Sequence, residues 1–501
     1  MSADVCILVE GTYPFVTGGV SAWIHSLISN LAEFTFTVVH IGAVRDADRR
    51  PKYELPPNVV GFTEVFVHEP SPQGEDLQKM SPSKVDWEDL AKLHEAFAHG
   101  DPAASIDVLH REARRWPNQA AASRLFHSKE SWDFLLESYR LRAPQSSFID
   151  YFWTYRVTHM SLFAILNASL PKAHLYHATS TGYAGLAGAL AKVRTGVPLL
   201  ITEHGIYTRE REIEIAQANW IHSDHPTSPR LDAQPGVFRA WWTQMFKFMS
   251  QFSYDCSDEI ISLTRVNQRF QLQDGADPDR MQVIPNGVSV ERFGNVRLLE
   301  RADPERFVVG LVGRVVPIKD VKTFLQAIKI ARDVIPALVA YVVGPLDEDA
   351  SYYDECCEMA RFLGIADVVQ FTGRADVLDY YRHIDVLVLT SLSEGQPLVI
   401  LEANCAGVPV VATDVGACRE LLEGASRDDQ ELGPSGLLTS SASPHETAEA
   451  LVRLWRDEPL RQRLARAGQE RVRRFYREES VYEAYRGLYV NGLRGAEAEV
   501  A

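Results

Sequence analysis

The stretch DVLVLTSLSEGQPLVILEANCAG, residues 385–407, joins a short apolar run, a polar loop and a segment of helical length. The apolar run at 385–391 predicts a strand buried on both faces. Pro397 suits the first position of a helix, which would place Glu402 about a turn and a half into it. Glu394 and Glu402 could then face one ligand at the helix N-terminus, where amides and the helix dipole favour anions. Two glutamates can equally be solvated surface groups, so the context decides.

The same succession of apolar run and helical segment recurs along the chain. Other candidate strands are residues 5–10, 36–42, 173–179, 197–205, 259–264, 307–313, 337–344, 368–373 and 408–414. Helix-length segments such as 322–335 lie between most of them. Near-continuous apolar strands that alternate with helices predict parallel sheets covered on both faces. The two series of strands therefore predict an α/β protein with two Rossmann-like domains.

The domain limits follow from breaks in this rhythm. We expect a first domain at 1–297, a second at 298–470 and a helix at 471–501 that packs back on the first domain. The segment 70–150 is rich in proline, tryptophan and charge, and it predicts a helical insertion in the first domain. Residues 460–495 predict one long charged helix.

Composition excludes several classes of protein. Of the 501 residues 46% are hydrophobic and 24% charged, and the net charge of −16 argues against a general nucleic-acid binder. No apolar run is long enough to predict a membrane span, and the start of the chain has no basic segment typical of a secretory signal. The six cysteines form no C-x-x-C pair, which favours a reducing compartment. We expect a cytoplasmic protein.

Two loops carry candidate anion-binding groups. Arg314 and Lys319 flank a loop between a strand and a helix, where paired cations can bind a diphosphate. Gly18 and Gly19 lie between the first strand and a helical stretch, and this is how a backbone approaches a phosphate. The pattern is neither G-x-G-x-x-G nor a P-loop, so a dinucleotide oxidoreductase is not indicated. Arg374 follows another strand, where a nucleotide base could stack.

These motifs, in this order, resemble the retaining GT-B glycosyltransferases of class four (GT4). The family's E-x7-E signature is matched by Glu394 and Glu402, and its diphosphate clamp by Gly313-Arg314 and Lys319. Further matches are VIPNGVSVERF at 283–293, Gly18-Gly19, and TEHG at 202–205. The resemblance implies a GT-B fold, in which two Rossmann-like domains face a central cleft.

The resemblance also implies a role for each donor-binding position. Glu402 would hold the ribose hydroxyls, Glu394 the hydroxyls of the donor hexose, and Arg314 and Lys319 the diphosphate as it leaves. Backbone amides would bind phosphate and hexose oxygens; they belong to the stretch that includes Gly395, Gln396, Leu398 and Val399.

Other implied roles fall outside that stretch. His204 would lie near the reacting carbon, and Gly18 and Gly19 would approach the diphosphate from the other domain. A side chain at either glycine would obstruct that approach. The expected catalytic residues are thus His204, Glu394, Arg314 and Lys319.

Some positions depart from the family pattern. Gln396 and Pro397 replace an aromatic residue and a glycine, and proline has no amide to donate. Asp320 replaces a glycine after Lys319, and it is a candidate N-cap for a helix that begins at Val321.

The implied function is metal-independent transfer of a hexose or N-acetylhexosamine from a UDP-sugar to a growing extracellular polysaccharide. Within the family, the start of the chain and its long insertion are similar to transferases of Pel exopolysaccharide synthesis. An inner-membrane synthase or export complex is then a candidate partner, with the protein peripheral to that membrane. Two alternatives remain: a nucleotide-sugar epimerase or hydrolase on this fold, and a non-catalytic nucleotide-sugar-binding subunit of a membrane synthase.

Several other groups have a plainer interpretation. D-x-D occurs at 46–48 and 347–349, and we interpret both as solvated acidic groups rather than metal ligands. His174 and His177 are expected to face a cleft or the core, and Trp241 and Trp242 the core.

Overall fold

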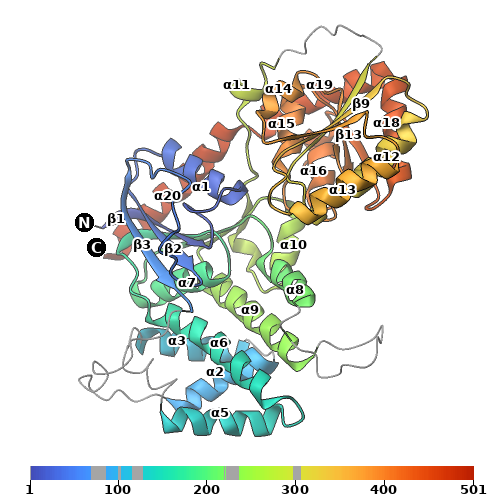
Figure 1. Cartoon of the computed structure of the whole chain (residues 1–501). Helices are drawn as coiled ribbons and strands as arrows, with labels where there is room; N and C mark the ends of the chain where they lie inside the picture. The colour runs from blue at the N-terminus through green and yellow to red at the C-terminus, as the bar shows by residue number, and fades with distance from the viewer. Residues whose placement is uncertain are drawn as a thin grey trace. The chain divides into compact units, whose positions relative to one another are not determined.

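The computed structural model describes residues 2–68, 86–99, 103–115, 128–218, 221, 236–296 and 306–500. The chain divides into two compact units (Figure 1). The first comprises Met1–Ser262, Gln268–Gln282 and Tyr485–Ala501, and the second Leu263–Asn267 and Val283–Ala484. The expected limits at 297/298 and 470/471 stay predictions. None of the helices described is long and apolar enough to cross a membrane.

The first unit is built on a sheet with the strand order β3-β2-β1-β4-β5-β6-β7. Its strands are β1 (Ala3–Glu10), β2 (Phe36–Gly42), β3 (Val59–Phe66), β4 (Ala173–Ala178), β5 (Leu199–Glu203), β6 (Glu259–Ser262) and β7 (Met281–Val283). The neighbours from β3 to β6 pair in parallel. Every residue of β2 and β5 is buried, as expected for strands covered on both faces. The expected strands at 36–42, 173–179, 197–205 and 259–264 are thus confirmed.

Helices of the first unit pack against this sheet and against one another. They are α1 (Gly19–Asn30), α2 (Trp87–His99), α3 (Ala103–Arg115), α5 (Lys129–Arg142), α6 (Phe148–Asn167), α7 (Tyr183–Thr195), α8 (Tyr207–Gln217), α9 (Val237–Cys256) and α10 (Arg265–Gln273). Within 70–150 the described residues form α2, α3, α5 and the start of α6, so they are helical as expected; residues 70–85, 100–102 and 116–127 lie outside the described residues. Trp241 and Trp242 are buried in the core, as predicted.

The second unit has a six-stranded sheet with the order β10-β9-β8-β11-β12-β13, parallel throughout. Its strands are β8 (Phe307–Val312), β9 (Leu338–Val343), β10 (Val369–Gly373), β11 (Val386–Leu389), β12 (Val410–Thr413) and β13 (Gly436–Thr439). The five strands expected here are confirmed. Alternate residues of β8 and β11 belong to different core clusters, so both faces of the sheet are buried.

Two layers of helices contribute to these clusters. The longer helices are α12 (Val321–Arg332), α13 (Ala350–Phe362), α15 (Leu398–Ala406), α18 (Pro444–Arg456), α19 (Glu458–Phe475) and α20 (Glu478–Val500). Shorter ones are α11 (Val290–Phe293), α14 (Val377–Tyr381), α16 (Cys418–Glu423) and α17 (Arg427–Gln430). Pro397 is the N-cap of α15 and not its first residue, so the helix begins one position later than expected, at Leu398.

The expected single helix at 460–495 is wrong: the chain forms two helices with a break at Tyr476–Arg477. The amide of Val288 donates to the carbonyl of Tyr476, and the amide of Glu478 donates to the carbonyl of Val288. Backbone groups that would continue the helix are therefore used in a strand-like bridge between Val288 and Arg477. From Tyr485 onward α20 belongs to the first unit.

Candidate functional site

The loops that follow β8 and β11 lie side by side at the carboxyl edge of the second sheet. The strand order places β8 next to β11, although β9 and β10 come between them in the sequence. Chain connections leave in opposite directions at such a switch point, and ligands of open α/β sheets bind there. By this rule, residues 313–320 and 390–397 are the candidate ligand-binding loops of the second unit.

Lys319 and Glu394 meet at this point. Lys319 Nζ lies 2.5 Å from Glu394 Oε1, and the two side chains are 18% and 10% exposed. Thr390 Oγ1 donates to the carbonyls of Lys319 and Asp320, at 3.1 and 3.0 Å, so the two loops are tied together. The sequence placed both charged residues at the same ligand but did not predict that they pair with each other.

Asp320 begins α12 and caps it. Its φ of +44° lies in the left-handed region, and its carboxylate accepts from the amide of Thr323 at 3.2 Å. Aspartate tolerates this conformation better than most residues and is a preferred N-cap. The predicted capping role is confirmed, so this carboxylate is engaged at the helix terminus.

Arg314 and Arg374 are exposed at the same edge. Arg314 Nη1 lies 3.0 Å from Glu348 Oε2, and its side chain is 55% exposed. Arg374 Nη2 lies 3.3 Å from Asp347 Oδ1. Exposed ion pairs contribute little, about 0–1 kcal/mol, so either arginine can exchange its carboxylate for another anion. Among the described residues, each arginine is thus paired with a carboxylate other than Glu394.

Gly416 packs closely against the backbone of the loop that carries Glu394. A Cβ at Gly416 would lie 1.8 Å from the carbonyl oxygen of Glu394, and φ at this glycine is +52°. The amide of Ala417 donates to the carbonyl of Gly395 at 3.0 Å. Both the backbone conformation and the close approach therefore require glycine at 416.

Gln396 is buried, and its side chain is already engaged. Its Oε1 accepts from the amide of Asn286 at 2.6 Å, which ties this loop to the VIPNG turn. The first amide-to-carbonyl bond at the start of α15 runs from Ile400 to Pro397. The amides of Leu398 and Val399 precede that bond, so they are donors that the helix does not use.

Glu402 is partly buried on the same helix. Its Oε2 accepts from Tyr381 Oη at 3.1 Å. Burial raises the pKa of Glu402, while the Tyr381 hydrogen bond and the charge of Arg292 lower it. Glu402 and Glu394 are related by their place on one strand–loop–helix segment.

The first unit has a hollow of about 200 Å³ at the carboxyl edge of its own sheet. Its walls include Glu10, Thr179, Ser180 and His204, which end or follow β1, β4 and β5. β1 and β4 are neighbours although β2 and β3 separate them in the sequence, so this is again a switch point.

His204 lies in this hollow against Trp23, with the ring centroids 4.5 Å apart. Its Nε2 is buried and has no hydrogen-bond partner among the described residues. Burial lowers the pKa of His204 to about 4, so the ring is neutral at neutral pH. A neutral imidazole with an unused nitrogen can accept or donate a proton for a bound molecule.

Glu203 is a buried neighbour that sequence reasoning did not single out. Its carboxylate accepts from Thr181 Oγ1 at 3.0 Å, from Gln271 Nε2 at 2.9 Å and from the hydroxyl of Tyr254. Burial raises its pKa, and these donors lower it. The residue was visible within TEHG, but a glutamate at the end of an apolar strand gives no sign of how many donors surround it.

Gly18 and Gly19 begin α1, with Gly18 as N-cap. A Cβ added at either position meets nothing within 4 Å, so no contact inside the protein requires glycine here. Gly182 differs, because its Cβ would lie 2.2 Å from the ring of Tyr207. The expected obstruction at Gly18 and Gly19 therefore concerns only an external ligand and stays a prediction.

The remaining candidates have structural roles or lie on the surface. His177 is buried, with its Nε2 2.8 Å from Thr202 Oγ1 and its Nδ1 2.7 Å from Tyr489 Oη, as expected of a core histidine. His174 is exposed. Of the D-x-D residues, Asp347 pairs with Arg374, and Asp349 caps α13 through the amide of Tyr352.

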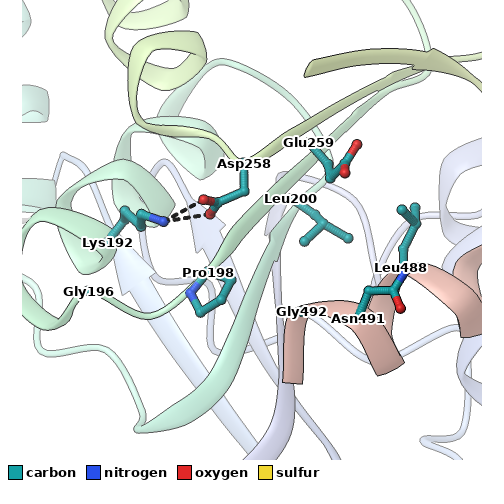
Figure 2. Close-up of a pocket in the computed structure, with 9 residues that line it drawn as sticks. All are labelled: Lys192, Gly196, Pro198, Leu200, Asp258, Glu259, Leu488, Asn491 and Gly492. Atoms are coloured by element: carbon teal, nitrogen blue, oxygen red, sulfur yellow. Dashed lines mark hydrogen bonds and ion pairs between the residues drawn. The ribbon is translucent and has the colours of Figure 1, made fainter. Parts of the chain in front are cut away.

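A second hollow of the first unit, about 250 Å³, lies at the opposite edge of the sheet (Figure 2). It is lined by residues before and at the start of β5 and β6 and by the middle of α20, among them Pro198, Asp258 and Asn491. Ligand sites of α/β sheets lie at the carboxyl ends of strands, so we assign it no part in the candidate site.

Comparison with known families agrees with the division of the chain into two units. Residues 3–279 match the family model described as "Domain of unknown function (DUF3492)". The chain belongs to this family. Residues 299–471 of this DUF3492 protein match the model "Glycosyl transferases group 1", so the second unit carries a glycosyltransferase group 1 domain. The resemblance to glycosyltransferases is thus confirmed at the level of that group.

Relatives and solved structures extend the comparison. A D-inositol 3-phosphate glycosyltransferase of Thermomonospora curvata is 31% identical over 303 residues, which cover 57% of this chain and 64% of that protein. The Anabaena protein HepE, crystallised with UDP and glucose, superposes with a TM-score of 0.56 over 97% of this chain and 99% of its own, at 16% identity. Sucrose-phosphate synthase of Thermosynechococcus elongatus gives a TM-score of 0.58 over 97% and 98%, at 16% identity. At these identities the structures establish the fold, which is GT-B, with two Rossmann-like units.

Proposed function

We propose that this DUF3492 protein is a retaining glycosyltransferase that moves a hexose or N-acetylhexosamine from a UDP-sugar to a growing extracellular polysaccharide of the Pel type. The observation that carries the proposal is the Lys319–Glu394 pair at the β8/β11 switch point, in which Glu394 shares its strand–loop–helix segment with Glu402. Neighbours with UDP and with UDP-glucose bound support the donor class. The start of the chain, which resembles transferases of Pel exopolysaccharide synthesis, supports the polysaccharide as acceptor.

The donor would bind to the second unit through groups with complementary chemistry. We propose that Glu402 accepts hydrogen bonds from the ribose hydroxyls, because Tyr381 occupies only one of its oxygens. Lys319 would leave Glu394 for the diphosphate, so that Glu394 becomes free to accept from hexose hydroxyls. The unused amides of Leu398 and Val399 suit phosphate or hexose oxygens.

Five further residues are proposed to contact the donor. Arg314 and Arg374 are exposed, and each would have to leave a surface carboxylate before it could bind the donor. Gly395 would contribute its backbone. Gly18 and Gly19, which have open space around them, would contact the diphosphate through their amides.

The proposed reaction breaks the bond between the anomeric carbon and the leaving diphosphate and forms a bond to the acceptor oxygen on the same face. Charge develops on the leaving phosphate, where Lys319 and helix amides would stabilise it without a metal. The acceptor proton passes to that phosphate. His204, neutral and with Nε2 unused, is proposed as the second participant near the reacting carbon.

Calorimetric titration with UDP, without added metal, tests the donor site. Lys319→Ala removes one charged contact, worth about 1.5–3 kcal/mol, so Kd should rise about 10- to 150-fold. Lys322→Ala is the matched control, because Lys322 lies three residues on and pairs with Glu355 on the surface. Unchanged affinity in Lys319→Ala, or no binding of UDP by the wild type, would overturn the proposal.

A second assay separates transfer from the alternatives. A transferase releases UDP from UDP-sugar in proportion to acceptor, a hydrolase releases it without acceptor, and an epimerase changes the sugar without releasing UDP. A binding subunit would retain UDP affinity but show none of these reactions. The membrane synthase or export complex remains a proposed partner, and peripheral attachment to the inner membrane follows only if that partner is found.

A further inference from the structure

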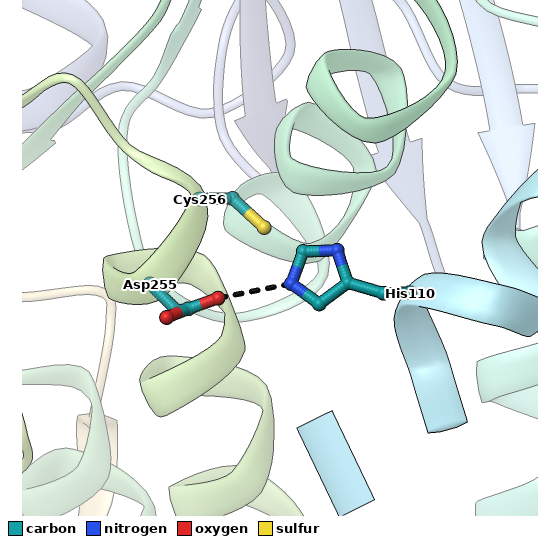
Figure 3. A group of neighbouring side chains, drawn as sticks. All are labelled: His110, Asp255 and Cys256. Atoms are coloured by element: carbon teal, nitrogen blue, oxygen red, sulfur yellow. Dashed lines mark hydrogen bonds and ion pairs between the residues drawn. The ribbon is translucent and has the colours of Figure 1, made fainter. Parts of the chain in front are cut away.

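Three potential metal ligands lie close together between α3 and the end of α9. His110 lies on α3, and Asp255 and Cys256 are the last two residues of α9 (Figure 3). One ligand atom from each lies within 4.8 Å of the other two. His110 Nε2 is 3.0 Å from Asp255 Oδ2. The three atoms in Figure 3 converge on one point between the two helices.

The spacing suits a small tetrahedral ion. Zn²⁺ binds histidine nitrogen, carboxylate oxygen and thiolate sulfur at about 2.0–2.3 Å, so neighbouring ligand atoms in such a site are roughly 3–4 Å apart. The His110–Asp255 separation of 3.0 Å already has this value, and Cys256 Sγ lies within 4.8 Å of both other ligand atoms, so a small side-chain movement would complete the spacing. The His110 and Asp255 side chains are 31% and 49% exposed, which leaves a side open for water as a fourth ligand.

The charges around the cluster do not oppose a cation. Lys192 lies close to Cys256, but its Nζ binds both oxygens of Asp258 at 2.7 Å (Figure 2). Arg280 is held by Asp277 and by the carbonyls of Asp255 and Ser257. The side chains of Lys192 and Arg280 are thus held by groups other than the three ligand side chains, and the Asp255 carboxylate and a Cys256 thiolate would balance the charge of one divalent ion.

We propose that His110, Asp255 and Cys256 bind one Zn²⁺ ion that fastens α3 to the end of α9. On binding, the Cys256 thiol loses its proton to solvent and the sulfur coordinates the metal. Imidazole Nε2 coordinates as the neutral ring, which requires its proton to reside on Nδ1. The site is separate from the proposed transfer chemistry, since none of its residues lines the His204 hollow.

The full-length protein, dialysed first against a chelator and then against limiting ZnCl₂, gives the test. Mass spectrometry of the metal should find one Zn²⁺ per chain in the wild type and none in His110→Ala or Cys256→Ser. With CoCl₂ in place of zinc, the wild type should show a thiolate-to-cobalt charge-transfer band, and Cys256→Ser should lose it. Metal should raise Tm in the wild type but not in His110→Ala or Cys256→Ser.

Two control variants remove a similar residue elsewhere. His174→Ala deletes an exposed histidine and Cys357→Ser a partly exposed cysteine, and both should keep the metal. Asp255→Asn retains the shape of an exposed side chain, so it should fold like the wild type and bind zinc more weakly. Absence of stoichiometric zinc in the wild type, or retention of zinc and the cobalt band in both His110→Ala and Cys256→Ser, overturns the proposal.

Discussion

Tyr381→Phe should destabilise the second unit mainly through Glu402, because it deletes one oxygen and leaves the ring in place. Tyr381 is fully buried, and its hydroxyl donates to Glu402 Oε2 at 3.1 Å, with the carbonyl of Val399 at the longer distance of 3.5 Å. A hydrogen bond to a charged group contributes about 1.5–3 kcal/mol, so its loss should raise the pKa of Glu402 further. For a domain of this size the same loss lowers Tm by about 3–12 °C.

The effect depends on pH with a definite sign. Burial already raises the pKa of Glu402 above its ordinary value of 4.5, so the ionised carboxylate costs stability above its folded pKa. That cost disappears as pH falls through the folded pKa toward 4.5, because the protonated carboxyl no longer needs a donor. Tyr381→Phe should therefore lose several degrees of Tm at about pH 8 and far less at about pH 5.

Thermal unfolding followed by circular dichroism is the assay, with Tyr380→Phe as the matched control. Tyr380 is the preceding residue, and its ring packs on Tyr341. In a Glu402→Gln background the effect of Tyr381→Phe should be much smaller, since no buried charge remains. An equal loss of Tm at both pH values, or an undiminished loss in the Glu402→Gln background, would refute this account of the pair.

Three other changes test separate parts of the molecule. Arg471→Met should destabilise the second unit by about 3–5 kcal/mol in chemical denaturation, because it leaves the buried carboxylate of Asp429 without its partner; an effect below about 1 kcal/mol would contradict this. Gly416→Ala should change the free energy of UDP binding, measured by calorimetry, more than the free energy of unfolding obtained from the shift in Tm, since the added Cβ displaces the Glu394 loop. NMR should show the His204 ring titrating near pH 4, because burial lowers its pKa to about 4. The free energy of unfolding should fall as pH drops from 6.5 to 4, and His204→Asn should reduce this dependence on pH.

The strands predicted from the sequence are those buried on both faces. Near-continuous apolar runs such as 36–42 and 307–313 predict buried strands, and both form them. β3 was not expected, because its residues alternate between partly buried and exposed at the edge of the sheet. The break between α19 and α20 could not be predicted either, since a bridge to Val288, far away in the sequence, causes it.

For the candidate site, the sequence predicted which loops carry the charged residues but not which partners they have. Arg314 and Lys319 were expected to act together, yet each pairs with a different carboxylate. Motif spacing places residues on elements, whereas side-chain pairing depends on how neighbouring loops meet. The cluster of His110 with Cys256 illustrates the extreme case, because nothing local to either residue indicates the other.

Two tyrosines in the first half of α20 affect how the protein is made. Tyr485 and Tyr489 complete the core of the first unit by bonding to Thr202 and His177. Because the ribosome delivers these residues after the second unit, the amino-terminal unit cannot close its core until that unit has been synthesised. Premature termination before Tyr485 should therefore leave both halves translated and the first one dependent on chaperones.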